Sequence, residues 1–367
     1  MESIELLRQR LVAGMVIPAH PLALRKDRSF DEQSQSRLSR YYLDCGVGGL
    51  AVGVHTTQFA IHDPHCGLLQ TVWQIAAEVA RGRAAQASSN TVLIAGLCGD
   101  THQATAEAAL AKSLSYDAGL LSLASLKDAS EEVLLEHCLQ VSRAIPLFGF
   151  YLQPAVGGRV LSYRFWRKFC ELENVVAIKV APFNRYQTLD VVRALHDSGR
   201  VAEIALYTGN DDSIVVDLCS QYRLGMQRDA TPVRFQGGLL GHWACWTRSA
   251  VELHQRCQRA VAIAPETDPA SASAASGGNV EELRTLLSLA HQVTDMNAAL
   301  FDAANSFRGC IAGIQEVLYR QGLIESNLCL DAEERLSVGQ AEELDRVQRL
   351  YPHLVDDQFV TEWLGLQ

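Results

Sequence analysis

The sequence predicts a (β/α)8 barrel, or TIM barrel, followed by a C-terminal helical extension. Two observations lead to this fold class. Continuous apolar runs, typical of parallel strands buried on both faces, alternate eight times with segments of helical periodicity. The alternation occupies about 260 residues, close to the roughly 250 residues usual for such a barrel. A doubly wound open sheet is the alternative, but its first strand usually leads into a glycine-rich turn. Here the first strand leads into Pro18-Ala19-His20-Pro21.

Each predicted strand is a short run of apolar residues, followed by a segment in which apolar residues recur at helical spacing. The strands are Val12–Pro18, Gly49–Val54, Thr91–Leu97, Gly119–Leu123, Leu147–Tyr151, Val175–Lys179, Ile204–Thr208 and Val233–Gln236. The helices are Asp31–Cys45, Leu69–Ala85, Ala104–Asp117, Ser130–Ala144, Ser162–Leu172, Tyr186–His196, Ser213–Gln221 and Trp243–Val261.

The chain beyond the barrel predicts a different organisation. We expect the barrel to occupy residues 1–262 and a flexible linker to occupy 263–279, because Pro265–Gly278 consists mostly of small residues. Residues 280–367 are predicted to be helical, with helices at Val280–Ile324 and Ser337–Leu350. Such helices need a surface to pack on, so we expect them to pack on the barrel or on a second subunit.

Composition narrows the classes of function. The chain has 32 Lys and Arg residues against 42 Asp and Glu, a net charge of −10, and no basic stripe, which disfavours nucleic acid and anionic membrane as partners. No apolar run approaches the roughly 20 residues of a membrane span. The N-terminus lacks the apolar segment of a signal peptide. The ten cysteines form no CxxC pair, so we expect reduced thiols and a cytoplasmic protein.

The chemistry of a barrel of this kind is expected where its strands end on their C-terminal side. Lys179 ends the sixth strand after Val175-Val176-Ala177-Ile178. An ammonium group in such surroundings is partly desolvated, which lowers its pKa and frees the amine as a nucleophile. A lysine whose side chain simply extends to solvent is the alternative. Tyr151 ends the fifth strand, where it is either a core aromatic or a proton carrier for an imine-forming lysine.

These residues resemble a known family. The segments Tyr151-Leu152-Gln153-Pro154, Gly157-Gly158 and Asn174–Lys179 look like the Tyr-x-x-Pro, Gly and Asn-(apolar)3-(Ile or Val)-Lys pattern of the dihydrodipicolinate synthase and N-acetylneuraminate lyase family. These proteins are class I, Schiff-base-forming lyases on a (β/α)8 barrel. Thr56-Thr57 is similar to the Gly-Thr-Thr-Gly-Glu turn of the family, and Gly209–Asp212 to its Gly-Asp-Asp.

The resemblance implies roles for individual residues. Lys179 would form an imine with the C2 carbonyl of a 2-oxo acid such as pyruvate, and Tyr151 would relay protons. Thr56 and Thr57 would hold the substrate carboxylate through their hydroxyls and backbone N–H groups, with Gly209 beside the substrate. The reaction would cleave, condense or dehydrate the 2-oxo acid without a cofactor or a metal. The family also implies a homo-oligomer, a dimer or a tetramer.

The sequence departs from the family at several positions. His55 stands where the family has the first Gly of its turn, as an additional substrate-binding group or a histidine without a role. Leu126 falls where dihydrodipicolinate synthases have a second Tyr, and Val156 where they have an Arg that holds a carboxylate; the nearest arginine is Arg159. Since Leu passes no proton and Val grips no carboxylate, we predict that the chain is not a dihydrodipicolinate synthase.

Two other classes of function stay open at this point. One is a metal-dependent hydrolase on a similar barrel, which would use His55, His62, His65 and Asp211, although their spacing matches no metal motif. The other is a non-catalytic member of the family whose pocket binds a carboxylate metabolite. Reduction with borohydride separates these classes from a Schiff-base enzyme, because only an imine is trapped.

Overall fold

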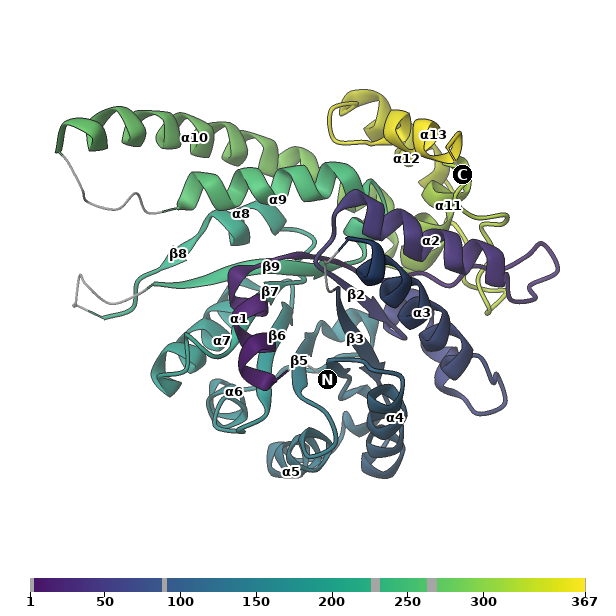
Figure 1. The fold of residues 1–367 in the computed structure, drawn as a ribbon, viewed down its shortest axis with the longest axis horizontal. Coiled ribbons are helices and arrows are strands. Elements are labelled where there is room, and N and C mark those ends of the chain that lie inside the picture. Colours follow the sequence, from purple (N-terminus) through teal and green to yellow (C-terminus); the bar gives the residue numbers. More distant parts are fainter. Residues whose placement is uncertain (1–2, 88–90, 226–231, 263–268, 367) are drawn as a thin grey trace.

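The fold is described for residues 3–87, 91–225, 232–262 and 269–366 of a computed structural model, in which nine strands share one sheet (Figure 1). The strands are β1 (Val16–Pro18), β2 (Gly49–Val52), β3 (Val92–Leu97), β4 (Ala118–Leu121), β5 (Leu147–Leu152), β6 (Val175–Ala181), β7 (Ala205–Thr208), β8 (Gln221–Tyr222) and β9 (Val233–Leu240). The helices are α1 (Ile4–Ala13), α2 (Glu32–Cys45), α3 (Leu69–Ala87), α4 (Thr101–Ser113), α5 (Glu131–Ser142), α6 (Tyr163–Phe169), α7 (Arg185–Ser198), α8 (Ile214–Cys219), α9 (Thr247–Val261), α10 (Pro269–Leu300), α11 (Cys310–Arg320), α12 (Gln340–Leu350) and α13 (Asp357–Leu364).

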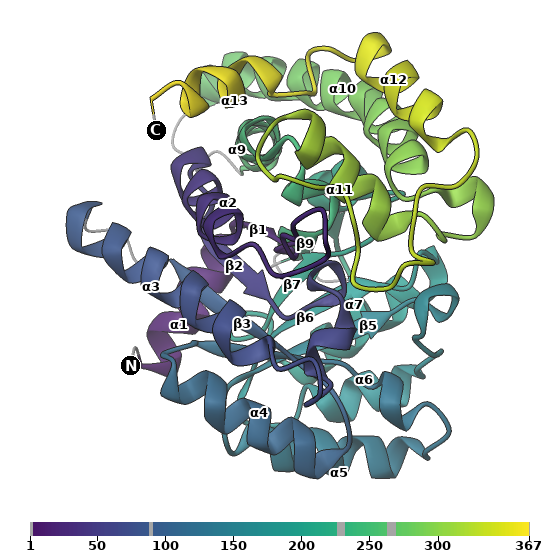
Figure 2. The same ribbon diagram turned by 90° about the vertical axis from the view of Figure 1, so that its right-hand side faces the viewer.

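Eight of the strands form a parallel barrel, and β8 is a short antiparallel partner of β9 outside it. The parallel strands pair in the order β1-β9-β7-β6-β5-β4-β3-β2. A bridge between Ala19 and Ala51 joins the two ends of this order, and the backbone N–H of His20 donates to the Ala51 carbonyl at 2.8 Å. Helices lie between successive strands and surround the sheet (Figure 2). The predicted (β/α)8 fold with a C-terminal helical region is therefore confirmed.

The first predicted strand was too long at its N-terminal end. Val12 belongs to α1, which is capped by the Ser3 hydroxyl and ends where Gly14 adopts a φ of 86°. Leu7 and Leu11 lie one helical turn apart, and both are buried against the apolar interior of the barrel. Helix α1 contacts β6, β7 and β9, so it closes the N-terminal end of the barrel.

The C-terminal region also differs from its prediction. Helix α10 begins at Pro269, so residues 269–279 of the predicted linker are helical, and 263–268 lie outside the described residues. Four alanines between 269 and 276 explain the difference, because Ala has the highest helix propensity. The predicted long helix Val280–Ile324 is two helices, α10 and α11, separated by a segment in which Asp302, Ser306 and Phe307 have left-handed backbones.

The C-terminal helices lie together on one side of the barrel, next to α2 and α9 (Figures 1 and 2). Helix α10 packs against α8 and α9. Two buried hydrogen bonds join the region to the barrel: Gln315 donates to the Leu22 carbonyl at 2.7 Å, and Tyr41 donates to the Asp356 carboxylate at 2.8 Å. Among the helices of the described residues, none is long and apolar enough to cross a membrane.

Candidate active site

A cavity of about 60 Å³ lies at the C-terminal end of the barrel strands. This volume exceeds the roughly 15 Å³ that one water needs, so the cavity has room for a small organic molecule. Its walls come from the ends of several strands and from the segment between α10 and α11: Ala19, Val54, His55, Thr56, Phe150, Leu152, Gln153, Val156, Lys179, Ala181, Phe183, Gly209, Asp211, Gly241, Phe301, Phe307 and Cys310.

Lys179 reaches this cavity from inside the barrel. In β6 the neighbours two residues away, Ala177 and Ala181, belong to the core inside the barrel, whereas Ile178 and Val180 face the surrounding helices. Lys179 shares the inward face and is only 9% exposed. Gly209 leaves room for it, because a Cβ at that position would lie 2.7 Å from the Lys179 Cε atom.

The surroundings of Lys179 raise the fraction of neutral amine above that of an ordinary lysine. Burial lowers the pKa of Lys179 to about 8, and the negative charge of Asp211 partly opposes this shift. The Nζ atom also lies 4.5 Å from the centre of the Phe150 ring. A lysine with a pKa of about 8 is unprotonated in roughly a tenth of molecules at pH 7, far more often than an ordinary lysine.

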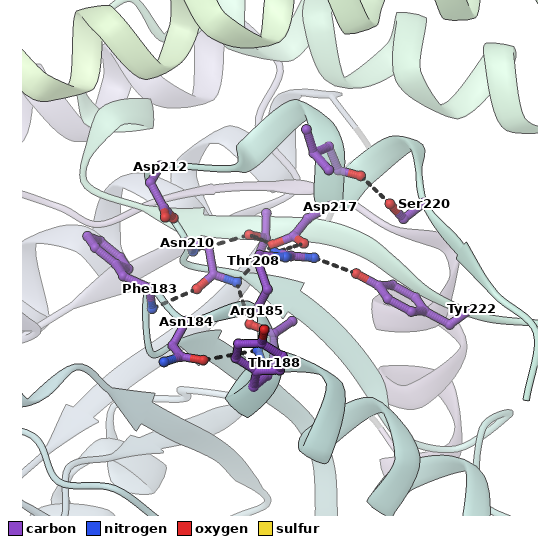
Figure 3. A network of polar contacts seen from close by, with 12 residues as sticks. Phe183, Asn184, Arg185, Thr188, Thr208, Asn210, Asp212, Asp217, Ser220 and Tyr222 are labelled. Atoms are coloured by element: carbon purple, nitrogen blue, oxygen red, sulfur yellow. Dashed lines mark hydrogen bonds and ion pairs between the residues drawn. The ribbon is translucent and has the colours of Figure 1, made fainter.

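Asp211, in the loop after β7, also lines the cavity. A network of buried polar groups fixes this loop (Figure 3). Asn210 is at its centre: its side chain donates to Asp217 at 2.9 Å and accepts from the Phe183 backbone at 3.1 Å. The Asp217 carboxylate also accepts from Thr208 at 2.7 Å and pairs with Arg185 at 2.6 Å. The network is satisfied, so it is expected to hold the loop rigidly.

The two predicted threonines use their hydroxyl protons elsewhere. Thr57 donates its hydroxyl proton to the His20 carbonyl at 2.6 Å and accepts from the N–H groups of Gly53 and Val54. Thr57 does not line the cavity. Thr56 does, but it donates to the Ala19 carbonyl at 2.8 Å. The expectation that both hydroxyls hold a carboxylate therefore lacks support, since each proton is engaged by the barrel backbone.

His55 lines the cavity beside these threonines. Burial lowers the pKa of His55 to about 4, and the nearby charge of Lys179 adds to the shift. The imidazole is thus neutral at physiological pH, with one nitrogen able to donate and one able to accept. The structure places His55, Thr56, Lys179 and Gly209 around the same cavity, and their roles toward a substrate stay predictions.

The structure does not bring Tyr151 to this cavity. Phe150 faces Lys179 across β5 and β6, so the next residue, Tyr151, points outward. Its ring packs on Trp166 with centroids 5.2 Å apart. Its hydroxyl donates to the Leu161 carbonyl at 3.3 Å and accepts from the Leu161 N–H at 3.2 Å. The proton-relay role expected for Tyr151 therefore lacks geometric support, because a strand shows alternate residues on opposite faces.

The residues of the hydrolase alternative do not gather either. His62 donates to the Glu107 carboxylate at 3.0 Å and to the Gly53 carbonyl at 2.7 Å. Burial alone would lower the pKa of His62, but hydrogen bonds with Cys98 and Glu107 raise it to about 10. His65 is exposed. Among the residues that the structure describes, no group of three His, Cys, Asp or Glu side chains is placed to hold a metal ion.

Sequence reasoning missed the part of the cavity contributed by the C-terminal region. Phe301, Phe307 and Cys310 line it, and the Phe307 ring packs edge-on against Phe183 with centroids 5.7 Å apart. Phe183 and Phe307 both hold left-handed backbones, with φ of 52° and 65°, which is strained for bulky residues and concentrates at functional sites. No local motif signals this, because the contact joins segments far apart in the sequence.

The structure places the three residues at which the sequence departs from the dihydrodipicolinate synthase pattern. Val156 lines the cavity, whereas Leu126 is not among the lining residues. Arg159 cannot take over from Val156 without losing contacts, since its guanidinium donates to the carbonyls of Lys127 and Ala129 at 2.7 and 2.6 Å. Of these three residues, Val156 alone lines the cavity, and it brings no charge to it.

Comparison with solved structures identifies the architecture. The dihydrodipicolinate synthase of Acinetobacter baumannii, solved in complex with pyruvate, superimposes with a TM-score of 0.68 over 92% of this chain and 98% of its own, at 18% identity. The N-acetylneuraminate lyase of Fusobacterium nucleatum, also complexed with pyruvate, gives 0.67 over 94% and 99%, at 14% identity. The dihydrodipicolinate synthase of Aquifex aeolicus gives 0.68 over 94% and 99%, at 19% identity.

This chain has their fold. The likeness spans nearly the full length of these proteins, so it includes C-terminal helices as well as the barrel. No family model matches the sequence. No curated protein matches it either. The resemblance seen in the sequence motifs is thus confirmed at the level of the fold, while the sequence itself is far from these proteins.

Proposed function

We propose that the chain is a class I, Schiff-base-forming lyase or aldolase that acts on a 2-oxo acid through Lys179. One observation carries the proposal: the amine of Lys179 is buried in a cavity at the C-terminal end of the barrel, and burial lowers its pKa to about 8. Such an amine attacks the C2 carbonyl, and the protonated imine then accepts electrons from a bond at C3. The fold shared with the two lyase classes supports the same chemistry.

The carboxylate of the substrate would lie against His55 and the backbone of Thr56, which border Lys179 on one side. A neutral imidazole donates one hydrogen bond to an anion without the cost of burying a second cation. The protonated imine supplies the positive charge. This arrangement replaces the threonine hydroxyls, whose protons the barrel backbone already binds.

The remainder of the substrate is proposed to be apolar beyond C3. The cavity has an apolar wall made by Phe150, Leu152, Val156, Phe301 and Phe307, and the uncharged amide of Gln153 also lines it. A second carboxylate placed there would be buried without a cationic partner, at a cost of several kcal/mol by order of magnitude. We therefore retain the proposal that the chain is not a dihydrodipicolinate synthase, and expect negligible turnover of pyruvate with aspartate semialdehyde in a coupled assay.

A panel of 2-oxo acids tests the proposal. Pyruvate, 2-oxobutyrate, 2-oxo-4-phenylbutyrate and 2-oxoglutarate are each incubated with the protein and borohydride, and intact mass reports the reduced adduct. We expect adducts with the first three acids and little with 2-oxoglutarate, because its distal carboxylate meets the apolar wall. The matched control is Lys179→Ala, which removes the amine. Absence of any adduct in the wild-type protein would contradict the function.

A non-catalytic carboxylate-binding protein is the second candidate. The observation that favours it is the outward position of Tyr151, since the cavity lacks the proton carrier of the related lyases. This candidate predicts that calorimetry detects binding of pyruvate while borohydride traps nothing. An adduct in the panel decides against it.

Two broader proposals accompany the function. We propose a cytoplasmic location, supported by ten cysteines that are all free thiols, which suits a reducing compartment. We also propose a homo-oligomer, a dimer or a tetramer, on the resemblance to the family alone; light scattering of the purified protein tests it.

A further inference from the structure

We propose that Asp211 is the acid–base residue that carries protons to and from the substrate bound to Lys179. The inference rests on the proposed function and supplies what that function lacks, a proton carrier in the cavity. Among the lining residues, the titratable groups are His55, Lys179, Asp211 and Cys310. Asp211 is the one carboxylic acid among them.

The carboxyl group of Asp211 has an oxygen available for a substrate. Its Oδ1 atom is buried and has no hydrogen-bond partner among the described residues. A buried polar atom without a partner costs roughly 1–3 kcal/mol, so a substrate group that bonds to this oxygen would recover that free energy. The atom belongs to a residue that lines the same cavity as the Lys179 amine, and the two side chains interact electrostatically.

Two segments of the chain hold Asp211 in this position. On the barrel side, Asn210 is fixed by its bonds to Asp217 and to the Phe183 backbone (Figure 3). From the C-terminal region, the Asn297 amide donates to the Asp211 backbone carbonyl at 2.6 Å. Neither contact engages the Asp211 carboxyl group, so the backbone is anchored while the side chain stays available for chemistry.

Burial and two charged neighbours set the pKa of Asp211, and the other titratable groups of the cavity are uncharged. Burial raises its pKa to about 7, the Lys179 ammonium opposes the shift, and Asp212 adds to it. His55 is the neutral imidazole described above, and burial holds the Cys310 thiol in its protonated form by raising its pKa. Near neutral pH the Asp211 carboxyl group therefore exists both as an acid and as a base, as proton transfer in both directions requires.

The steps balance without a further reactant. The neutral Lys179 amine bonds to C2, and the carbinolamine forms after proton transfer from nitrogen to oxygen. The Asp211 acid then gives its proton to the C2 hydroxyl, and the C2–O bond breaks. A water molecule departs, and the protonated imine remains on Lys179. The Asp211 carboxylate next takes a proton from C3, or from a hydroxyl on C4 when the C3–C4 bond breaks, and the electron pair moves into the imine to give the enamine.

Hydrogen–deuterium exchange at C3 of pyruvate measures these steps directly. Proton NMR follows the loss of the methyl signal in D2O, which requires both the imine and proton removal at C3. We expect Asp211→Asn to slow the exchange by about 10²–10⁴-fold. The loss cannot come from the amine, because removing the Asp211 charge lowers the pKa of Lys179 further and leaves more of it unprotonated.

The matched control is Asp212→Asn, which removes one negative charge from the neighbouring, exposed position. We expect a loss far smaller than that of Asp211→Asn, because Asp212 only adds to the pKa shift that burial of Asp211 causes. Asp211→Ala with added formate distinguishes a proton-transfer role of Asp211 from a structural one, because the formate carboxylate takes the vacated space. We expect formate to restore exchange in this variant only. Circular dichroism confirms folding, and Asp211→Glu, which keeps a carboxylic acid, should exchange faster than Asp211→Asn.

The outcomes separate this inference from the proposed function. A wild-type protein that forms no borohydride adduct with pyruvate contradicts the function itself. A wild-type protein that forms the adduct, with Asp211→Asn exchanging at the wild-type rate, overturns the role of Asp211 alone. The role of Asp211 is also overturned if Asp212→Asn lowers the exchange rate as much as Asp211→Asn does. It is overturned as well if formate does not rescue Asp211→Ala and the Asp211→Glu and Asp211→Asn variants exchange at equal rates.

Discussion

The loops after β2 and β7 both border the cavity, but they use their polar side chains differently. In the loop after β2, the hydroxyls of Thr56 and Thr57 donate to backbone carbonyls of Ala19 and His20. In the loop after β7, Asn210 makes the structural bonds, and the neighbouring Asp211 keeps one buried oxygen without a partner among the described residues.

The difference separates residues that build the site from residues that are available to act in it. A hydroxyl whose proton is bound by the backbone contributes to folding, since breaking its bonds leaves buried groups unsatisfied. A carboxyl oxygen without a partner is available for binding or catalysis. The threonine pair is the closer match to the sequence motif of the family, yet the structure points to the carboxylate as the group free to react.

The largest effect on stability is expected from Thr57→Val, which keeps the shape of the side chain. It leaves the N–H groups of Gly53 and Val54 without their side-chain acceptor. The His20 carbonyl loses its 2.6 Å bond from Thr57 and keeps only the weaker 3.4 Å contact from the Thr56 hydroxyl. At roughly 1 kcal/mol or more for each group, the free energy of unfolding should fall by about 3 kcal/mol. Urea denaturation measures it.

Thr56→Val is the control for that variant, because its hydroxyl donates only to the backbone ahead of β2, mainly to Ala19. We expect a loss of about 1 kcal/mol. Equal losses in the two valine variants, or no loss in either, would contradict the structural role that we assign to the hydroxyls of the loop after β2.

Gly209→Ala sharpens the contrast on the β7 side. The new Cβ would lie 2.7 Å from Lys179 Cε and 2.8 Å from Ala181 Cβ, so the amine must move. We expect a stability loss of about 1–3 kcal/mol from overpacking, together with slower adduct formation with pyruvate. Calorimetric unfolding and time-resolved borohydride trapping measure the two effects.

Gly82→Ala serves as the matched substitution, because Gly82 is an exposed residue in α3 with open space around its Cα. We expect a gain of about 0.5–1 kcal/mol, the usual preference of a helix for Ala. Adduct formation should not change. Unaltered trapping in Gly209→Ala would show that this glycine does not position Lys179.

Tyr151→Phe gives the smallest expected effect. The hydroxyl is buried on the outer face of β5, bonded to the backbone of Leu161. Its removal should cost about 1 kcal/mol of stability and leave the exchange of pyruvate protons within about twofold of the wild-type rate, since a proton carrier contributes at least about 10²-fold. A fall in the exchange rate of about 10²-fold would show that Tyr151 acts as a proton carrier. It would contradict the assignment of that role to Asp211.

Much of the fold follows from sequence periodicity, because eight buried parallel strands leave continuous apolar runs that local reading detects. Helix α1 was not predicted because its last residues, Leu11-Val12-Ala13, continue through Gly14 into the first strand without an intervening polar residue. Lys179 and Gly209 were found because both lie at the C-terminal side of strands, Lys179 near the end of β6 and Gly209 directly after β7. The face of β5 on which Tyr151 lies was not predicted, because a sequence motif carries no information on which face a residue takes. An irregularity between Leu147 and Phe148 also shifts the pairing register of β5 with β6.

The most direct test of the account is the position of the borohydride-reduced pyruvate adduct in the wild-type chain. Peptide mapping by tandem mass spectrometry assigns the modified residue. The account predicts a single adduct on Lys179, whose amine is buried in the cavity with a pKa lowered to about 8. An adduct on a different lysine, or one that persists at full yield in Lys179→Ala, would contradict it.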